Sequence, residues 1–283
     1  MGKLKNRKLM KLIGLVCACT LLLVGYKESY IMEPVEMGGM VSVAHRGASG
    51  YAPENTHAAF RKGLELGADF LELDLHLSKD GELVIIHDDK VDRTTNGNGF
   101  VSDYTLAELK NLDAGSKFHK NFKDERIITL DELFSDFYGQ IGLLIEIKKP
   151  SKYPGIEEKV AAVLENYSDL SSVIVQSFDI ESMRKMHQLV PDLQVALLMK
   201  RSASQLSSKK IEDLSSFATF INFNISHVNK HIIDQIHSFG GKVLVWSAKD
   251  VRSINKAYQY GVDGIITDFS IWPLEDEIFI AKE

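Results

Sequence analysis

Strand-like and helix-like segments alternate along most of this chain, and this alternation limits the folds that it can adopt. Helical periodicity recurs over residues 55–66, 155–166, 180–189, 230–239 and 251–260. Eight short apolar segments are candidate strands: Val41 to Ala44, Phe70 to Asp74, Leu143 to Lys148, Val173 to Ser177, Gln194 to Met199, Thr219 to Phe223, Lys242 to Ser247 and Gly264 to Thr267. Strands joined through helices pair in parallel, so eight of them within about 240 residues predict one α/β domain, a (β/α)₈ TIM barrel over residues 40–283.

A β-hairpin is expected directly after the second strand. Asp80 and Gly81 lie between alternating apolar residues, and this pair is typical of a two-residue type I′ turn. With such a turn, Leu83 to His87 forms an antiparallel strand, and counting along the ladder places Asp74 opposite His87. The hairpin is then an excursion above the barrel mouth and not a ninth barrel strand.

The connection that follows the hairpin is too long to be a simple loop. From about Arg93 to Arg126 the chain is polar and contains glycine, with one helical stretch at Leu106 to Asn111. The next helix starts near Thr129. We therefore expect a small insertion over residues 93–126.

Three carboxylates are predicted to meet at the mouth of the barrel. Glu72 and Asp74 alternate with leucines in the second strand, so they share one face, and Glu146 and Lys148 share a face in the third. Active sites of such barrels lie at the carboxyl ends of the strands. Ligands that offer only carboxylate oxygens suit one hard divalent cation, Mg²⁺ or Ca²⁺, on Glu72, Asp74 and Glu146. The alternative is that these acids only form ion pairs with Arg46 and Lys148.

Two histidines and two fixed cations accompany these acids. His45 follows the first strand and His87 ends the hairpin strand. Cleavage of a phosphodiester requires a base for the attacking oxygen and an acid for the leaving alcohol, and histidine can serve as either near neutral pH. We therefore predict acid and base roles for His45 and His87, and phosphate binding by Arg46 and Lys148.

Three further residues are candidate substrate contacts. Asn55 precedes the first helix and could cap it, reach into the site, or do both. Phe178 and Trp246 stand at the ends of strands, where their rings could pack on a glycerol backbone. Core packing explains either aromatic ring almost as well.

The amino-terminal segment has the pattern of a targeting sequence. Five basic residues and no acid occupy the first eleven positions, and an uncharged apolar run of 14 residues follows from Leu12 to Gly25. That length fits a signal peptide better than the roughly 20 residues of a transmembrane helix. We expect residues 1–33 to be a signal or membrane-anchor segment and residues 34–39 to be a linker. The barrel is then held at the membrane outside the cytoplasm, by an uncleaved or lipidated anchor, or it is secreted.

Charge and cysteine content restrict the partners of the barrel. Beyond the first eleven residues, 28 basic residues face 39 acidic ones, an excess of 11 negative charges. This excess argues against nucleic acid as a partner. Both cysteines, Cys17 and Cys19, lie in the apolar run, so the barrel has no disulfide. Nothing in the sequence indicates an oligomeric state.

From Ser42 to Phe269 the chain resembles the glycerophosphodiester phosphodiesterase family. The motifs that carry the resemblance are, in order, His45-Arg46-Gly47, Pro53-Glu54-Asn55-Thr56, Glu72-Leu73-Asp74, Lys79-Asp80-Gly81, His87-Asp88, Asp92-Arg93-Thr94-Thr95, Glu146-Ile147-Lys148, Gln176-Ser177-Phe178 and Gly264-Ile265-Ile266-Thr267-Asp268. Their combination and order are highly specific. One departure is Lys249, which stands where many relatives have asparagine and bears on substrate contacts rather than on the chemistry.

The resemblance implies a barrel with an inserted segment, a divalent cation on the three carboxylates and acid/base catalysis by the two histidines. It also implies a small-molecule substrate, a glycerophosphodiester that is hydrolysed to an alcohol and glycerol 3-phosphate. Two alternatives remain. One is a phospholipase D-like enzyme that acts on lysophospholipids. The other is a non-catalytic surface protein that binds phosphodiester polymers or lipid headgroups.

Overall fold

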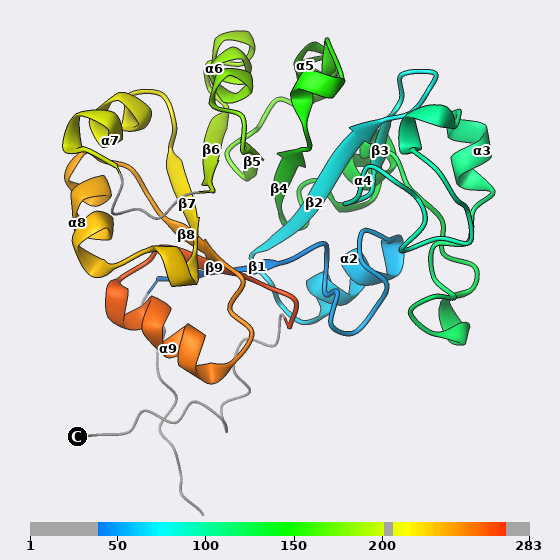
Figure 1. Ribbon diagram of the computed structural model, residues 1–283, viewed down its shortest axis with the longest axis horizontal. Helices are drawn as coiled ribbons and strands as arrows, with labels where there is room; N and C mark the ends of the chain where they lie inside the picture. Colours follow the sequence, from blue (N-terminus) through cyan, green and yellow to red (C-terminus); the bar gives the residue numbers. More distant parts are fainter. Residues whose placement is uncertain (1–38, 201–205, 270–283) are drawn as a thin grey trace, which may run out of the picture. The chain divides into compact units, whose positions relative to one another are not determined.

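A closed barrel of eight parallel strands forms the centre of the protein (Figure 1). The structure, a computed structural model, describes residues 39–200 and 206–269. The barrel strands are β1 (Val41–Ala44), β2 (Phe70–Leu77), β4 (Gly142–Ile147), β5 (Val173–Ser177), β6 (Gln194–Met199), β7 (Phe220–Asn224), β8 (Leu244–Trp246) and β9 (Gly264–Thr267). Neighbours in the chain pair in parallel, and β1 also pairs with β9, which closes the barrel. The predicted (β/α)₈ TIM barrel is confirmed.

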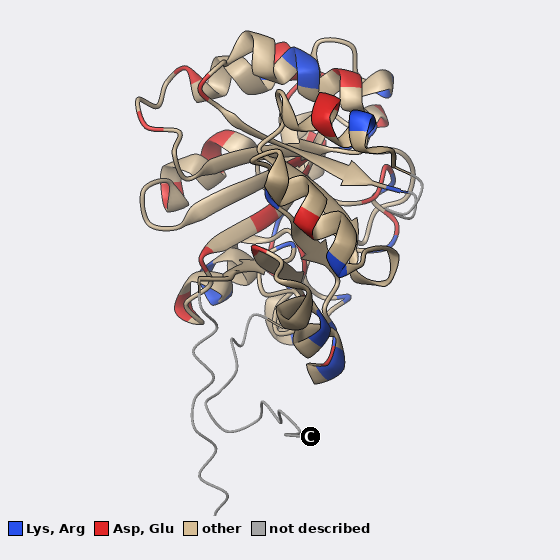
Figure 2. Ribbon diagram, turned by 90° about the vertical axis from the view of Figure 1, so that its left-hand side faces the viewer, with Lys and Arg blue, Asp and Glu red and all other residues tan. Residues whose placement is uncertain are grey.

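Helices follow most of the barrel strands and cover their outer side. They are α2 (His57–Glu65), α4 (Leu130–Phe137), α5 (Ile156–Leu164), α6 (Ile180–Leu189), α7 (Ser208–Ser215), α8 (Lys230–Ser238) and α9 (Val251–Tyr260). The N-cap of α2 is Thr56, whose hydroxyl accepts from the amide of Ala59, so the expectation that Asn55 caps this helix is wrong. In the view of Figure 2, acidic and basic segments are interspersed along the outer helices.

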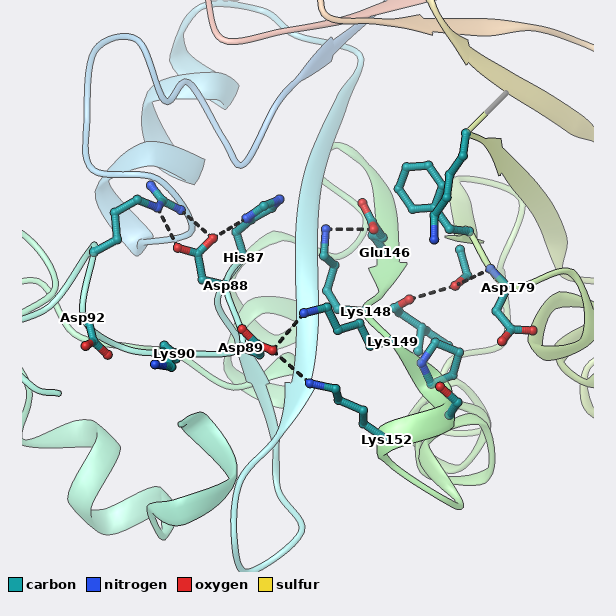
Figure 3. A pocket seen from close by; sticks show the side chains of 17 residues that line it. His87, Asp88, Asp89, Lys90, Asp92, Glu146, Lys148, Lys149, Lys152 and Asp179 are labelled. Carbon is teal, nitrogen blue, oxygen red and sulfur yellow. Dashed lines mark hydrogen bonds and ion pairs between the residues drawn. The ribbon is translucent and has the colours of Figure 1, made fainter. Parts of the chain in front are cut away.

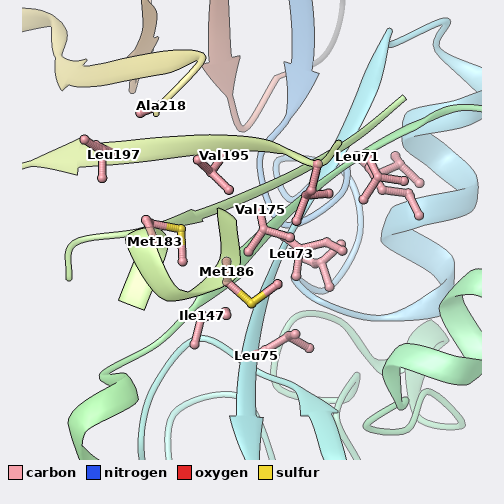
Figure 4. Packing of buried hydrophobic residues seen from close by; sticks show 14 of the residues in the cluster. Leu71, Leu73, Leu75, Ile147, Val175, Met183, Met186, Val195, Leu197 and Ala218 are labelled. Atoms are coloured by element: carbon pink, nitrogen blue, oxygen red, sulfur yellow. The ribbon is translucent and has the colours of Figure 1, made fainter. Parts of the chain in front are cut away.

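Alternation along β2 separates the core from the site. Leu71, Leu73 and Leu75 are fully buried against the helices, in the same cluster as Met183 and Met186 of α6 (Figure 4). The residues between them point to the opposite side, into the barrel. There a second, smaller cluster that includes Val43, Leu144, Ile174, Phe220 and Leu244 fills the lower interior. Polar groups are therefore left for the carboxyl ends of the strands.

The hairpin after β2 is present, but its register differs from the expected one. The short strand β3 (Leu83–Ile85) pairs antiparallel with β2, and His76 lies opposite Val84. The turn contains three residues, Lys79 to Gly81, and Gly81 adopts a φ of 84°. A type I turn followed by a left-handed glycine is a common three-residue hairpin loop. The extra loop residue shifts the ladder by one, so the expected pairing of Asp74 with His87 is wrong and Asp74 faces Ile86.

The insertion after the hairpin has a small core of its own. It contains the 3₁₀ turns η1 (Val101–Asp103) and η2 (Lys120–Phe122) and the short helix α3 (Leu106–Lys110). Its apolar side chains, among them Val101 and Leu109, pack with Val84 of β3 and with Ile86 and Val91, which follow that strand. In the part of the chain that the structure describes, no helix is long and apolar enough to cross a membrane. The predicted leader at residues 1–33 and most of the linker lie outside the described residues.

Candidate active site

The three predicted metal ligands converge at the top of the barrel interior. Asp74 of β2 and Glu146 of β4 are direct neighbours in the parallel register, and Glu72 lies two residues before Asp74 on the same face. All three are buried, and one oxygen from each lies within 4.8 Å of the others. Neighbouring parallel strands thus bring together carboxylates that lie more than 70 positions apart in the chain.

A strained corner after β1 positions Arg46. The residue adopts a left-handed φ of 54°, followed by 74° at Gly47. A Cβ atom on Gly47 would lie 2.5 Å from the backbone carbon of Ala59, so no other residue fits there. The corner directs the backbone amide of Arg46 to Glu72 Oε2, at 2.8 Å. It also places Nε of the Arg46 side chain 3.5 Å from Asp74 Oδ2. A non-glycine residue in this region is costly and typical of a functional site.

Asp74 is held from two further sides. The Lys148 ammonium lies 3.2 Å from Asp74 Oδ1 and 2.8 Å from Glu146 Oε1. The amide of Asn55 donates to Asp74 Oδ2 at 2.8 Å, from a backbone with a φ of 57°. Of the roles expected for Asn55, the structure therefore shows that its side chain reaches into the site. There it orients the carboxylate of Asp74.

Electrostatics in this cluster favour an additional cation. Burial and the charges of Asp74 and Glu146 raise the pKa of Glu72 well above its usual value. Burial would also raise the pKa of Asp74, but Lys148 and Arg46 outweigh it and lower that pKa. Arg46 also contacts Glu54, at 2.9 Å. Arg46 and Lys148 therefore lie among four acids, which are Glu54 and the three predicted metal ligands. An all-oxygen donor set with excess negative charge fits a hard divalent cation.

His45 has a carboxylate partner that was not among the candidates. Its Nδ1 lies 2.5 Å from Oδ1 of Asp268, which directly follows β9. The hydrogen bond from His45 lowers the pKa of Asp268, so this carboxylate stays ionised. A carboxylate accepts, so Nδ1 carries the proton of the neutral ring and Nε2 keeps its lone pair. The contact fixes the tautomer and leaves Nε2 for a substrate.

His87 is oriented in the same way. Its Nδ1 lies 2.7 Å from Asp88 Oδ1, and hydrogen bonds from Arg93 lower the pKa of Asp88 to about 2. Arg93 also makes two hydrogen bonds to Glu54, at 2.6 and 2.8 Å. Burial lowers the pKa of His87 itself, which favours its neutral form. Among the described residues, none donates to or accepts from Nε2 of either His45 or His87.

A third histidine supports the backbone of the second. His76 is fully buried, and its Nε2 lies 3.1 Å from the carbonyl oxygen of His87. That carbonyl only accepts, so Nε2 donates and Nδ1 accepts from the Tyr153 hydroxyl at 2.8 Å. Burial lowers the pKa of His76 to about 4. This residue is a structural support, as its place near the hairpin suggests.

An open cleft of about 730 Å³ leads away from the acidic cluster (Figure 3). Phe178 lines it together with His87, Glu146 and Lys148. The ring of Trp246 meets Phe178 edge-on at 5.8 Å, but it does not line the cleft and packs mainly on the inner barrel cluster. Phe178 is thus placed to touch a ligand, whereas Trp246 supports it.

Sequence reasoning missed the partners of the two histidines. Asp268 and Asp88 both stand in motifs of the family resemblance, yet neither is among the candidate site residues. Arg93, which binds Asp88 and Glu54, is not among them either. A usable signal existed for Asp268. In a closed barrel the last strand pairs with the first, so an acid after β9 must lie near a histidine after β1.

A parallel barrel with a buried acidic cluster and two carboxylate-bound histidines at its mouth defines an enzyme of the phosphodiesterase class. The model of the glycerophosphoryl diester phosphodiesterase family matches residues 45–271, and the chain belongs to this family. It is 41% identical over 231 residues to a glycerophosphodiester phosphodiesterase of Caldanaerobacter subterraneus, covering 80% of this chain and 93% of the relative. It is 36% identical to one of Bacillus subtilis, covering 81% and 84%.

A solved structure supports the same assignment. An Oleispira antarctica phosphodiesterase in complex with the product sn-glycerol-3-phosphate superimposes with a TM-score of 0.74 at 30% identity. The match covers 82% of this chain and 94% of that structure.

Proposed function

We propose that this protein hydrolyses glycerophosphodiesters, the deacylated phospholipids, to an alcohol and sn-glycerol 3-phosphate. The observation that carries the proposal is the arrangement of the two histidines. Each is fixed through Nδ1 by its own carboxylate, at 2.5 and 2.7 Å, and among the described residues none forms a hydrogen bond with either Nε2. Two rings in one tautomer can act as a base and an acid in the same reaction.

One divalent cation, Mg²⁺ or Ca²⁺, would be held by Glu72, Asp74 and Glu146. When bound, it neutralises charge on the phosphate and polarises the P–O bonds. Arg46 and Lys148 bind the remaining phosphate oxygens, the arginine by its planar fork. Glu54 and Asp74 keep the Arg46 guanidinium in place.

The two histidines move the protons. In its neutral form, one of His45 and His87 takes a proton at Nε2 from the attacking oxygen, either of water or of a substrate hydroxyl. The other, protonated, donates from Nε2 to the leaving alcohol. Asp268 and Asp88 stabilise the imidazolium forms without exchanging the proton themselves.

The test is turnover of glycerophosphocholine and glycerophosphoethanolamine by the full chain, after EDTA and after return of Mg²⁺ or Ca²⁺. We expect metal-dependent release of sn-glycerol 3-phosphate. His45→Ala and His87→Ala should each lower turnover by about 10²- to 10⁴-fold, because each removes a general acid or base. His231→Ala, an exposed histidine on α8, is the matched control. More than a tenth of wild-type turnover in either active-site variant would contradict the paired roles.

Lysophosphatidylcholine is the comparison substrate. Choline release from it, with none from glycerophosphocholine, would favour the lysophospholipase D alternative. Binding of all three compounds without turnover at any metal concentration would favour a non-catalytic binding protein.

We also propose that the amino-terminal segment places the enzyme at the membrane, facing away from the cytoplasm, or releases it by secretion. The support is the basic segment and apolar run described above. Cell fractionation combined with the mass of the mature chain tests this. A full-length chain in the cytoplasmic fraction would contradict it.

A further inference from the structure

The cleft beside the acidic cluster is larger than the phosphate and glycerol of a substrate require. Its volume of about 730 Å³ lies in the range of sites that enclose drug-sized ligands. Asp179 and Lys200, from the loops after β5 and β6, line it on the side of Phe178. The second substituent of a bound phosphodiester therefore has a defined space to occupy.

All of the acids that line this cleft already accept hydrogen bonds from neighbouring groups, and Figure 3 draws those of Asp88, Asp89 and Glu146. Glu146 accepts from Lys148, Asp88 from His87 and Arg93, Asp89 from Lys149 and Lys152, Asp92 from Asn98, and Asp179 from the first amides of α6. Neutral amides leave the charges of Asp92 and Asp179 in place, but the six lysine and arginine side chains of the lining outnumber its five acids, so the cleft carries no excess negative charge to attract a cationic group. A cation in the cleft would also have to compete with the lysines already there.

Two ammonium groups of the cleft, in contrast to the acids, have no ion-pair partner among the described residues. Among the described residues, no carboxylate lies within ion-pair distance of Lys200 or Lys90. Lys200 Nζ lies 5.3 Å from the centre of the Phe178 ring, and Lys90 Nζ lies 4.9 Å from that of Phe100. The ring of Phe178 is thus already paired with a cation. The Lys200 ammonium would therefore repel a quaternary ammonium headgroup and keep it from binding to the Phe178 ring.

We infer that this cleft is a leaving-group subsite that selects diesters whose alcohol carries additional negative charge, such as a second phosphate. The inference rests on the proposed function and names its preferred substrate class. Lys200 and Lys90 attract the distal anion, and Lys200 excludes a choline group from Phe178. Both are specificity residues that do not touch the scissile phosphate.

The test compares three substrates that differ in the charge of the alcohol. These are glycerophosphocholine, glycerophosphoglycerol and glycerophosphoglycerol phosphate. For the full chain with its metal we expect kcat/KM to rise in that order. Lys200→Glu and Lys90→Glu should each lower the ratio of the phosphate-bearing to the choline-bearing substrate by about three- to tenfold, because charges in a solvated cleft interact only modestly.

The matched control is Lys242→Glu. Lys242 also lies over a ring, with Nζ 5.8 Å from the centre of Phe220, but it precedes β8 and so lies at the end of the barrel away from the mouth. It should leave the ratio unchanged. Lys200→Ala, which adds no charge, should give an intermediate ratio, and 0.5 M salt should reduce the preference in the wild type.

Equal or better turnover of the choline diester, with a ratio that neither lysine variant changes, would overturn the inference while leaving the proposed function intact. Failure to hydrolyse any of the three diesters would overturn both. An equal effect of Lys242→Glu would show that overall charge, and not this cleft, sets the preference, and it too would overturn the inference.

Discussion

Asp268 and His45 are 223 residues apart in the chain, yet Asp268 Oδ1 lies 2.5 Å from His45 Nδ1. The contact exists because β1 and β9 are neighbours in the closed barrel. It holds the ring at Nδ1 and so orients Nε2, which lies on the opposite side of the ring. With the proposed role of His45, we expect Asp268 to be a positioning residue whose loss reduces the chemical step more than binding.

Asp268→Asn should lower kcat by about 10²-fold and leave KM within about twofold, because the tautomer and orientation of His45 are no longer imposed. Steady-state kinetics with a saturable glycerophosphodiester measure both parameters. Asp263→Asn is the matched control, since Asp263 holds His237 Nε2 at 2.9 Å at the other end of β9. A kcat above a tenth of the wild-type value in Asp268→Asn would contradict this role.

Glu72→Gln should stabilise the metal-free protein and abolish its response to metal. Burial and the charges of Asp74 and Glu146 raise the pKa of Glu72, so the neutral amide relieves repulsion. We expect a rise in Tm of about 2–4 °C in EDTA for each kcal/mol relieved. The wild type should gain about 2.7 kcal/mol when metal is present at 100 times its Kd, and Glu72→Gln should gain none.

Thermal unfolding with and without Mg²⁺ or Ca²⁺ checks this prediction. Glu157→Gln changes a buried carboxylate outside the site, one that accepts from Ser182 and Lys185. It should lose stability and keep the metal response. A metal response in Glu72→Gln equal to that of the wild type would show that the cation binds elsewhere.

His76 should make the stability of the metal-free protein depend on pH. Burial lowers its pKa from 6.5 to about 4, so its contribution is complete above pH 6.5 and is lost as pH falls towards 4. The sign follows because the unfolded chain binds the proton more tightly in this window, and the full effect is about 3 kcal/mol. Urea unfolding at pH 7 and pH 5 should show about 2 kcal/mol of this loss, because pH 5 still lies above the lowered pKa. The loss should be smaller in His76→Gln and unchanged in His231→Gln, and equal losses in all three proteins would refute the prediction.

Gly47→Ala should be clearly more destabilising than Gly67→Ala. Both glycines have a φ of 74°, so both variants strain the backbone by about 1–2 kcal/mol. At Gly67 a Cβ has nothing within 4 Å, whereas at Gly47 it would lie 2.5 Å from the backbone of Ala59. The difference between the two free energies of unfolding measures the steric part. Equal values would mean that the corner relaxes without cost.

The barrel could be predicted because its signal is local. Alternation in β2 separates Leu71 and Leu73 from Glu72 and Asp74, and parallel pairing then brings Glu146 beside Asp74. The hairpin register was missed because an Asp-Gly pair suits both a two-residue and a three-residue loop. Gly81 has a positive φ in either loop, and the two differ at Asp80, which a type I′ turn would place at a positive φ and which has none here.

Contacts between distant segments could not be read from the chain in the same way. Asn55 and Thr56 are both good caps, and the choice depends on Asp74, which draws the Asn55 amide into the site. The position of Lys200 over Phe178 depends on the neighbouring strands β5 and β6 ending together. Such relations follow from closure of the barrel and not from any one segment.

The pairing of β1 with β9 also has a consequence for biosynthesis. A ribosome adds about 5–20 residues each second, so His45 is translated about 10 to 45 s before Asp268. During that interval the nascent chain already carries the acids of β2 and β4 but has no oriented His45. With the proposed role of His45, we therefore expect hydrolysis only after the last strand has been translated and has docked, and we expect a prematurely terminated chain to be inactive.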